Sequence, residues 1–301
     1  MKMGLFEETG AILEKWEIPT NTLAEGKAIL PDIAFSLVGK IEEKKLEKED
    51  ILGIGVGVPA PVTAEGVVNG SANLGWKYKE VKKEMEELTG LKAFIGNDAN
   101  VAALGEMWKG GGAGEKNMIM VTLGTGVGGG VIIDGKMLVG CNGAGGEIGH
   151  ICVNYEEKDC CGCGNRGCLE QYASATGIVR LAKQKLETEK RETMLNKEKI
   201  TAKDVFDAVK AGDEVADEIA VSFGKYLGYG LANLAAVVNP AVFVIGGGVS
   251  KAGEVLLSYI EKPYKERAFF ADKNVRFVLA KLGNDAGICG AVKLVLDERG
   301  K

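Results

Sequence analysis

Strand-like and helix-like patterns of apolar positions occur in two similar stretches of the chain. In the second half, a continuous apolar run over 117–123 predicts a buried strand, a Gly-Thr-Gly turn follows, and 128–133 predicts a returning strand. Asp134-Gly135 is typical of a hairpin turn and leads into a third strand over 136–139. The opening MKMGLF, a turn and the run AILEKWEI match the later part of this unit. The two halves are therefore expected to share one fold.

The rest of the chain alternates strands with helices. Helical patterns and buried apolar runs are expected over these ranges: helices at 21–46, 78–88, 99–108, most of 176–235 and 286–296, and strands at 51–58, 92–95 and 241–245. The glycine-rich run 110–114 predicts a domain boundary. We therefore expect an α/β fold with a small lobe over 1–112, onto which a terminal helix 286–301 packs back, and a large lobe over 113–285. A cleft between two such lobes is where small substrates bind.

Composition narrows the classes of function. The 301 residues carry 37 basic and 42 acidic side chains, a net charge of −5, which argues against nucleic acid or an anionic membrane as partner. The start of the chain lacks the apolar stretch of a secretory signal. The apolar run 231–249 is interrupted by asparagines, a proline and three glycines, which predicts a helix end followed by a buried strand. Seven cysteines without an export signal favour a reducing cytoplasm.

The candidate metal site combines the only histidine with three cysteines. His150 precedes the run Cys161-Gly-Cys163-Gly-Asn-Arg-Gly-Cys168, whose glycines let a short loop wrap around an ion. Three thiolates and one imidazole form a tetrahedral set suited to Zn²⁺, and four protein ligands leave no position for a reactive water, so we expect a structural zinc. A redox pair or buried apolar thiols are the alternatives. The cysteines outside this glycine-spaced run are expected to be structural: Cys141, Cys152, Cys160 and Cys289.

Two glycine-rich turns follow predicted strands. The turn Gly124-Thr125-Gly126 begins a formal match to G-x-G-x-x-G, but that fingerprint must open a helix, and here a strand follows. The run 130–136 nearly matches a phosphate loop, but Met137 replaces the required hydroxyl residue. A strand, a tight turn and a returning strand can still offer backbone N–H groups and a hydroxyl to phosphates; a plain hairpin is the alternative. Gly246, Gly247 and Gly248 could accommodate a base or ribose, or form an ordinary strand-to-helix turn.

Polar residues between a short strand and a helix are candidates for acid–base chemistry. In Asn97-Asp98-Ala-Asn100, the aspartate could cap the helix. It could instead act as a general base that takes a hydroxyl proton while phosphorus is attacked, with the Asn97 amide fixing neighbouring hydroxyls. Together with Glu147, His150 and Glu170 these residues favour a polyol site, since each hydroxyl needs a donor and an acceptor.

This set of motifs resembles the ROK family of repressors, open reading frames and sugar kinases, and within it the bacterial glucokinases, over nearly the whole chain. The most specific element is Glu147-Ile-Gly-His150 followed by Cys161-x-Cys163-Gly-x-x-Gly-Cys168-x-Glu170, and 123–149 resembles the family signature segment. The resemblance implies an actin-like, ribonuclease-H-like two-lobed ATPase fold. It implies phosphoryl transfer from ATP with Mg²⁺ to a hexose, glucose to glucose 6-phosphate being the leading expectation. A homodimer in cytoplasmic glycolysis is also expected.

The resemblance assigns roles by position. The expected catalytic base is Asp98, and the metal ligands are those named above. Residues expected to hold the sugar are Asn97, Glu147, His150, Glu170 and, in the sequence SANLGW, Asn73. Glycines 124 and 126 with Thr125 are expected to meet the phosphates, and glycines 246–248 the adenosine.

The chain departs from the family pattern at its start. Family members open with a strand carrying an Asp-x-Gly-Gly-Thr loop that contacts the phosphates and the metal, and residues 1–10 contain no such sequence. Losing one phosphate loop removes transition-state stabilisation of ~3 kcal/mol or more, so we expect weak or absent kinase activity. A strand is also expected to be missing from the middle of a sheet, with a misplaced start codon as the simplest explanation. A non-catalytic sugar-binding protein and a ROK-type repressor are the alternatives, the latter requiring a DNA-binding segment.

Overall fold

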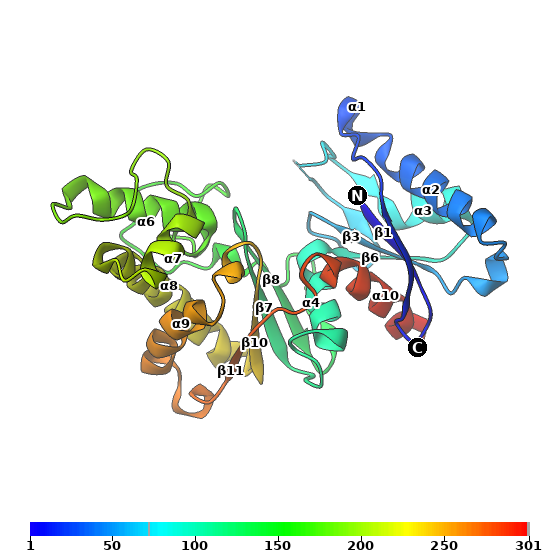
Figure 1. Cartoon of the computed structure of the whole chain (residues 1–301). Coiled ribbons are helices and arrows are strands. Elements are labelled where there is room, and N and C mark those ends of the chain that lie inside the picture. The colour runs from blue at the N-terminus through cyan, green and yellow to red at the C-terminus, as the bar shows by residue number, and fades with distance from the viewer. Residues whose placement is uncertain (72, 300–301) are drawn as a thin grey trace.

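The computed structural model describes residues 1–71 and 73–299 and shows two lobes on either side of two helices, α4 and α10 (Figure 1). A five-stranded sheet in the order β11-β10-β7-β8-β9 forms the base of the large lobe. Its strands, in chain order, are β7 (Met118–Leu123), β8 (Val127–Ile133), β9 (Lys136–Met137), β10 (Val242–Gly246) and β11 (Arg276–Leu279). The strands β7 and β10 run parallel, so the glycine turns that follow them leave the same edge of the sheet.

Alternation along β7 gives the sheet two buried faces. Ile119 and Val121 point into a core shared with the large-lobe helices, whereas Met118 and Met120 point into a core shared with α4 and α10. This alternation explains why the strand is a continuous apolar run rather than an alternating one. The helices on the first face are α5 (Glu170–Ala173), α6 (Ala175–Thr188), α7 (Ala202–Lys210), α8 (Glu214–Val238) and α9 (Glu254–Arg267).

The predictions for this lobe are mostly confirmed. The hairpin turn between β8 and β9 has Asp134 and Gly135 at positive φ (50° and 76°), as its sequence requires. The apolar run 231–249 divides into the end of α8, capped by Asn239 in a left-handed conformation, and the fully buried β10. None of the helices in the described residues is long and apolar enough to cross a membrane.

The small lobe contains short sheets and three helices. An antiparallel pair joins β1 (Lys2–Phe6) to β2 (Ile12–Glu17), and a parallel pair joins β3 (Ile54–Val58) to β6 (Ala93–Asn97). The remaining elements are β4 (Val67–Val68), β5 (Lys79–Glu80), α1 (Leu23–Gly26), α2 (Ile29–Glu43) and α3 (Val81–Thr89). Five 3-10 turns complete the described chain: η1 (Lys48–Asp50), η2 (Ile148–His150), η3 (Val249–Ala252), η4 (Phe270–Asp272) and η5 (Gly283–Asp285).

A cavity of about 960 Å³ separates the β1–β2 pair from the β3–β6 pair. It is lined by β1 of the first pair, by β3 of the second, and by side chains of α2 and α10. These two pairs are thus separate sheets, where the sequence predicted one sheet without its middle strand. Because Asp98 also lines this cavity, the gap reaches the candidate site.

Two helices that are distant in sequence pack between the lobes. The α4 helix (Asp98–Lys109) and the α10 helix (Ala286–Arg299) approach so closely that a Cβ on Gly290 would lie 1.7 Å from the Val101 carbonyl oxygen. A Cβ on Gly55 of β3 would lie 2.0 Å from the carbonyl oxygen of Ala291 in α10. The C-terminal helix therefore packs on the small lobe as well as on α4. Residues 300–301 of the expected helix lie outside the described residues, and the predicted domain boundaries stay a prediction.

Three local predictions differ from the structure. The helical stretch 21–46 is broken at Ala24 and Glu25, which have positive φ inside the short α1, so the long helix α2 begins only at Ile29. The helix expected from Tyr78 begins only at Val81, since 79–80 pair with β4 instead. The helix α9 and the strand β11 were not predicted, because polar residues interrupt the periodic spacing of their apolar residues.

The close approach of α4 and α10 makes a matched pair of glycine substitutions informative. We expect Gly290→Ala to lower the free energy of unfolding by about 1–3 kcal/mol, because the methyl group would overlap backbone atoms. Gly287→Ala, on the same helix but with no atom near its Cβ, should instead stabilise the protein by up to about 1 kcal/mol. Urea unfolding of both variants measures the difference; equal effects would show that the two helices do not pack in this way.

Candidate functional site

The candidate base lies at the junction of β6 and α4. The Asn97 side chain caps the helix, accepting hydrogen bonds from the N–H groups of Ala99 (3.0 Å) and Asn100 (3.1 Å) and donating to the Ala60 carbonyl (3.1 Å). The capping role that the sequence left open for Asp98 therefore falls mainly to Asn97. One Asp98 carboxylate oxygen also accepts from Ala99 N–H (2.8 Å), while the side chain lines the cavity.

The surroundings of Asp98 favour a carboxylate of increased basicity. Desolvation raises the pKa of Asp98, and the negative charge of Glu147 raises it further, against the lowering effect of the Ala99 N–H. A raised pKa makes the ionised carboxylate a better proton acceptor. The structure thus brings Asp98 and Glu147 into electrostatic contact although 49 positions separate them in the sequence.

The four predicted metal ligands converge. The ligand atoms of His150, Cys161, Cys163 and Cys168 all lie within 4.8 Å of one another. Cys163 Sγ and Cys168 Sγ are 3.6 Å apart, and Cys161 Sγ is 3.9 Å from His150 Nδ1. The ligand atoms of a tetrahedral zinc site lie about 3.5–3.8 Å apart, so the cluster is close to the size the ion needs.

The Cys168 thiol resists ionisation when no cation is bound. Desolvation, reinforced by the neighbouring thiols, raises the pKa of Cys168 to about 12. Three thiolates could not coexist here at neutral pH without a positive charge between them. The two ring nitrogens of His150 face different partners. Nδ1 faces Cys161, whereas Nε2 lies 3.9 Å from the Glu147 carboxylate. His150 can therefore bind a metal through Nδ1 and still direct Nε2 towards Glu147.

Glu170, the first residue of α5, joins the cysteine-rich loop to the Gly-Thr-Gly turn. One carboxylate oxygen is 3.7 Å from Cys161 Sγ, and the other accepts the N–H of Val127 (3.0 Å). A Cβ on Gly126 would lie only 2.1 Å from this carboxylate, so the second glycine of the turn makes room for it.

The two predicted nucleotide turns lie against each other. A Cβ on Gly247 would lie 2.5 Å from the carbonyl oxygen of Leu123, the residue that immediately precedes Gly124, and Gly247 itself has φ +86°. Gly248 has open space where a side chain would be. This arrangement follows from the parallel pairing of β7 with β10, and it leaves bare backbone on which a nucleotide could rest.

Asn73 and Asn100 depart from the sequence expectations in opposite ways. Asn73 is exposed in the turn between Ser71 and Trp76, and within the described residues no contact joins it to the other site residues. Asn100, to which no role was assigned, is buried and donates to the carbonyl of Gly145 (3.1 Å), just before Glu147. Its position one turn after the cap, on the same side of α4 as Asn97, was the available signal.

Comparison with known proteins identifies the family. The ROK family profile matches residues 1–298. A glucokinase of Halalkalibacterium halodurans is 45% identical, covering 98% of this chain and 91% of its own length. A xylose repressor of Caldicellulosiruptor bescii is 32% identical over 94% of this chain and 72% of its own length. The chain belongs to the ROK family.

The solved structures agree with this assignment. The crystal structure of a ROK family glucokinase from Streptomyces griseus, in complex with glucose and AMPPNP, is 34% identical with a TM-score of 0.76. The match covers 97% of this chain and 94% of that one. The predicted actin-like, two-lobed fold is confirmed. The similarity to glucokinases shows that this ROK protein is a sugar kinase.

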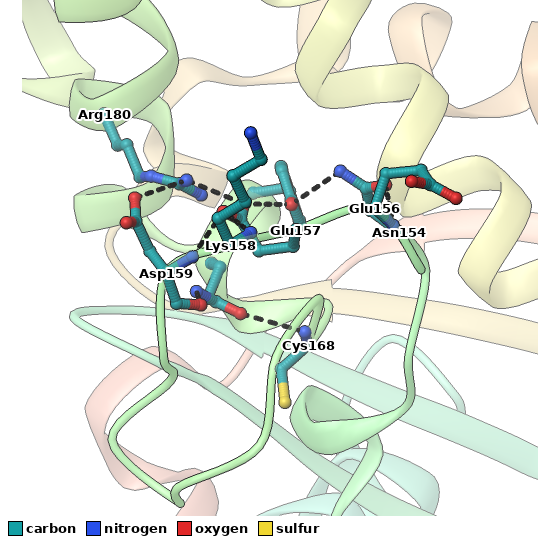
Figure 2. A network of polar contacts seen from close by, with 9 residues as sticks. Asn154, Glu156, Glu157, Lys158, Asp159, Cys168 and Arg180 are labelled. Carbon is teal, nitrogen blue, oxygen red and sulfur yellow. Dashed lines mark hydrogen bonds and ion pairs between the residues drawn. The ribbon is translucent and has the colours of Figure 1, made fainter.

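A hydrogen-bonded cluster anchors the segment that leads into the metal loop of this ROK protein (Figure 2). The Glu157 carboxylate accepts from the Tyr172 hydroxyl, from Arg180 (2.7 Å), and from the backbone N–H groups of Lys158 and Asp159 (each 2.9 Å). Desolvation opposes ionisation of Glu157, but these donors outweigh it and lower its pKa to about 2.

The same cluster reaches the metal ligands through Gln171 of α5. The Gln171 side chain donates to the Asp159 carbonyl (3.0 Å) and accepts from the Cys168 N–H (3.0 Å). Glu157 therefore fixes the loop to α5 and α6 without touching the metal ligands itself. No sequence pattern indicates this cluster, because Glu157 and Asp159 lie in a charged run of a kind that is usually solvated, and Arg180 lies on a separate helix.

This cluster predicts a measurable contribution to stability. We expect Glu157→Gln to lower the free energy of unfolding by about 1–3 kcal/mol at pH 7, because Arg180 and Tyr172 would lose their charged acceptor. The pKa of Glu157 is lowered on folding, so its contribution is complete above the unfolded value of about 4.3 and is lost as the pH falls towards 2.

Glu156→Gln is the matched control, since Glu156 is the exposed neighbour. Urea unfolding at pH 7 and pH 3 measures both variants. The wild type should lose more stability than Glu157→Gln on acidification, whereas Glu156→Gln should follow the wild type; parallel behaviour of all three proteins would contradict the assignment.

Proposed function

We propose that this ROK protein phosphorylates glucose with ATP to give glucose 6-phosphate. The observation that carries the proposal is that Asp98, whose pKa is raised, lies near Glu147 beside the metal loop. Glu170 connects that loop to the Gly-Thr-Gly turn. The glucokinase relative and the glucokinase structure with glucose and AMPPNP support the choice of substrates.

The proposed reaction is an in-line displacement at phosphorus. The sugar hydroxyl oxygen bonds to the γ-phosphorus of ATP, the bond from that phosphorus to the ADP oxygen breaks, and the hydroxyl proton moves to the Asp98 carboxylate. ATP enters as its Mg²⁺ complex. The raised pKa of Asp98 strengthens it as the acceptor. Backbone N–H groups of the Gly-Thr-Gly turn hold the phosphates, and glycines 246–248 lie beside the adenosine.

Sugar recognition is assigned to groups that keep hydrogen-bonding capacity. The Glu147 carboxylate, His150 Nε2 and Glu170 supply acceptors and a donor around the metal loop, and Asn97 retains one amide hydrogen beyond its bond to Ala60. Asn73 is kept as a proposed contributor from the exposed turn. A panel of sugars and phosphate donors distinguishes other hexoses and a polyphosphate donor, and the glucose assays below distinguish a non-catalytic sugar-binding role.

The metal cluster is proposed as a structural zinc site. His150, Cys161, Cys163 and Cys168 would hold the ion, which would supply the positive charge that the thiolates require and fix the loop carrying His150. We also propose that the protein is a homodimer and that it acts in glycolysis in the cytoplasm. The xylose repressor among the relatives keeps sugar-dependent regulation as the second candidate.

If Asp98 is the general base, its substitution should greatly lower the rate of phosphorylation and leave sugar binding intact. We expect Asp98→Asn to lower kcat/KM by about 10²–10⁴-fold, because the amide cannot accept the hydroxyl proton. Coupled release of ADP measures the rate, and calorimetric titration with glucose measures binding. The wild-type profile should lose activity on acidification at a pH above the usual aspartate range, in line with the raised pKa.

Asp134→Asn is the control, since Asp134 is exposed in the hairpin turn and is not among the residues assigned to the site. Glucose binding without ADP release by the wild type would favour the sugar-binding alternative and end the kinase proposal. Low but Asp98-dependent turnover would agree with the expected weak activity.

The zinc proposal is tested by composition. Elemental analysis of the purified protein should give about one zinc per chain. Cys163→Ser should lower this content, because it removes one thiolate of the four ligands, whereas Cys141→Ser should not, since Cys141 is exposed outside the cluster. Protein that retains its fold with no bound transition metal would rule the site out.

A further inference from the structure

The Gly-Thr-Gly turn is fixed from one side by the start of α6. The Ala175 N–H donates to the Gly124 carbonyl (2.8 Å), and the Thr176 hydroxyl lies 2.8 Å from the Thr125 carbonyl. Because a carbonyl oxygen only accepts, Thr176 is the donor in this pair. Two successive carbonyl groups of the turn therefore point at α6.

Peptide geometry converts this attachment into a direction for the N–H groups. In a planar trans peptide the carbonyl and the following N–H point in opposite directions, and the described backbone contains no cis peptide bond. With the carbonyls of Gly124 and Thr125 held on α6, the N–H groups of Thr125 and Gly126 point to the opposite side.

The neighbouring N–H groups of the turn already have acceptors. Gly124 N–H donates to the Gly126 carbonyl (3.0 Å), and Val127 N–H donates to Glu170 (3.0 Å). Throughout the described chain, no acceptor is found for the N–H groups of Thr125 and Gly126. Two adjacent N–H groups that point to one side form a concave site for an anion.

We propose that Thr176 is a positioning residue that aims the Thr125 and Gly126 N–H groups at the phosphates of the bound nucleotide. The proposal rests on the proposed kinase function. Thr176 does not itself contact substrate; it acts through the Thr125 carbonyl. Thr176 Oγ1 also lies 2.9 Å from the Ser174 hydroxyl, but Ser174 donates its hydrogen to the Glu170 carbonyl (2.7 Å), and Thr176 donates its own to Thr125.

The same corner connects the two halves of the site. Glu170 and Thr176 lie on consecutive helices, and Ser174 between them caps α6 through Gly177 N–H (2.9 Å) and lies 2.7 Å from the Glu170 carbonyl. The segment that carries a proposed sugar ligand therefore also sets the orientation of the phosphate turn. A change at Thr176 should act on the nucleotide first, because its hydroxyl donates its hydrogen bond to the turn.

The test compares substitutions that differ in one hydroxyl. Thr176→Val keeps the shape but removes the donor, and Thr176→Ser keeps the donor. Calorimetric titration with the Mg²⁺ complex of a non-hydrolysable ATP analogue should show binding about three- to tenfold weaker for Thr176→Val, as expected for one hydrogen bond, and nearly unchanged for Thr176→Ser. In the steady state, KM for ATP should rise by a similar factor, while glucose affinity stays at the wild-type value.

Thr188→Val is the matched control, since Thr188 is an exposed threonine at the other end of α6. Unfolding midpoints of all variants show whether the fold is intact. Nucleotide binding by Thr176→Val equal to that of the wild type, or an equal loss of glucose affinity, would overturn this inference and leave the kinase function standing. Failure of the wild type to bind the nucleotide would overturn both.

Discussion

The Glu170 carboxylate is the constraint on which the large-lobe side of the site depends. It lies 3.7 Å from Cys161 Sγ and accepts the N–H of Val127, so the metal loop and the first strand residue after the phosphate turn are held by one side chain. Gly126 is required because the carboxylate occupies the space of its missing Cβ. A carboxylate with both oxygens engaged is an accurately oriented acceptor, as the proposed recognition of sugar hydroxyls requires.

The small-lobe side depends on backbone contact rather than on charge. Asn97 satisfies the first N–H groups of α4 and thereby frees the Asp98 carboxylate to line the cavity. The helix is fixed against α10 by glycines that allow carbonyl contact, as Gly290 does at Val101. Because the strand pairs of this lobe do not join into one sheet, the packing of α10 on β3 and α4 carries much of its cohesion.

Two kinds of interaction hold the loop between these halves. The four metal ligands converge at one end of it, and the Glu157 cluster attaches the other end to α5 and α6. The hydrogen bonds to Glu157 depend on its own carboxylate charge, which belongs to the loop. The thiol cluster, by contrast, needs the positive charge of a bound cation before all three thiols can ionise. The loop is therefore tied to the body of the large lobe independently of the metal.

The sequence alone determined the candidate metal ligands, the buried strands, the glycine turns and the position of the candidate base, since each depends on local spacing or on periodicity. His150 and Cys161 could be paired because few side chains bind zinc and glycines separate the thiols. Only the tertiary structure decided that Asn97 rather than Asp98 is the main cap, that α4 meets α10, and that Thr176 holds the Thr125 carbonyl. These contacts join residues up to about 190 positions apart, and their formation depends on how sheets and helices pack, for which neighbouring residues in the sequence carry no signal.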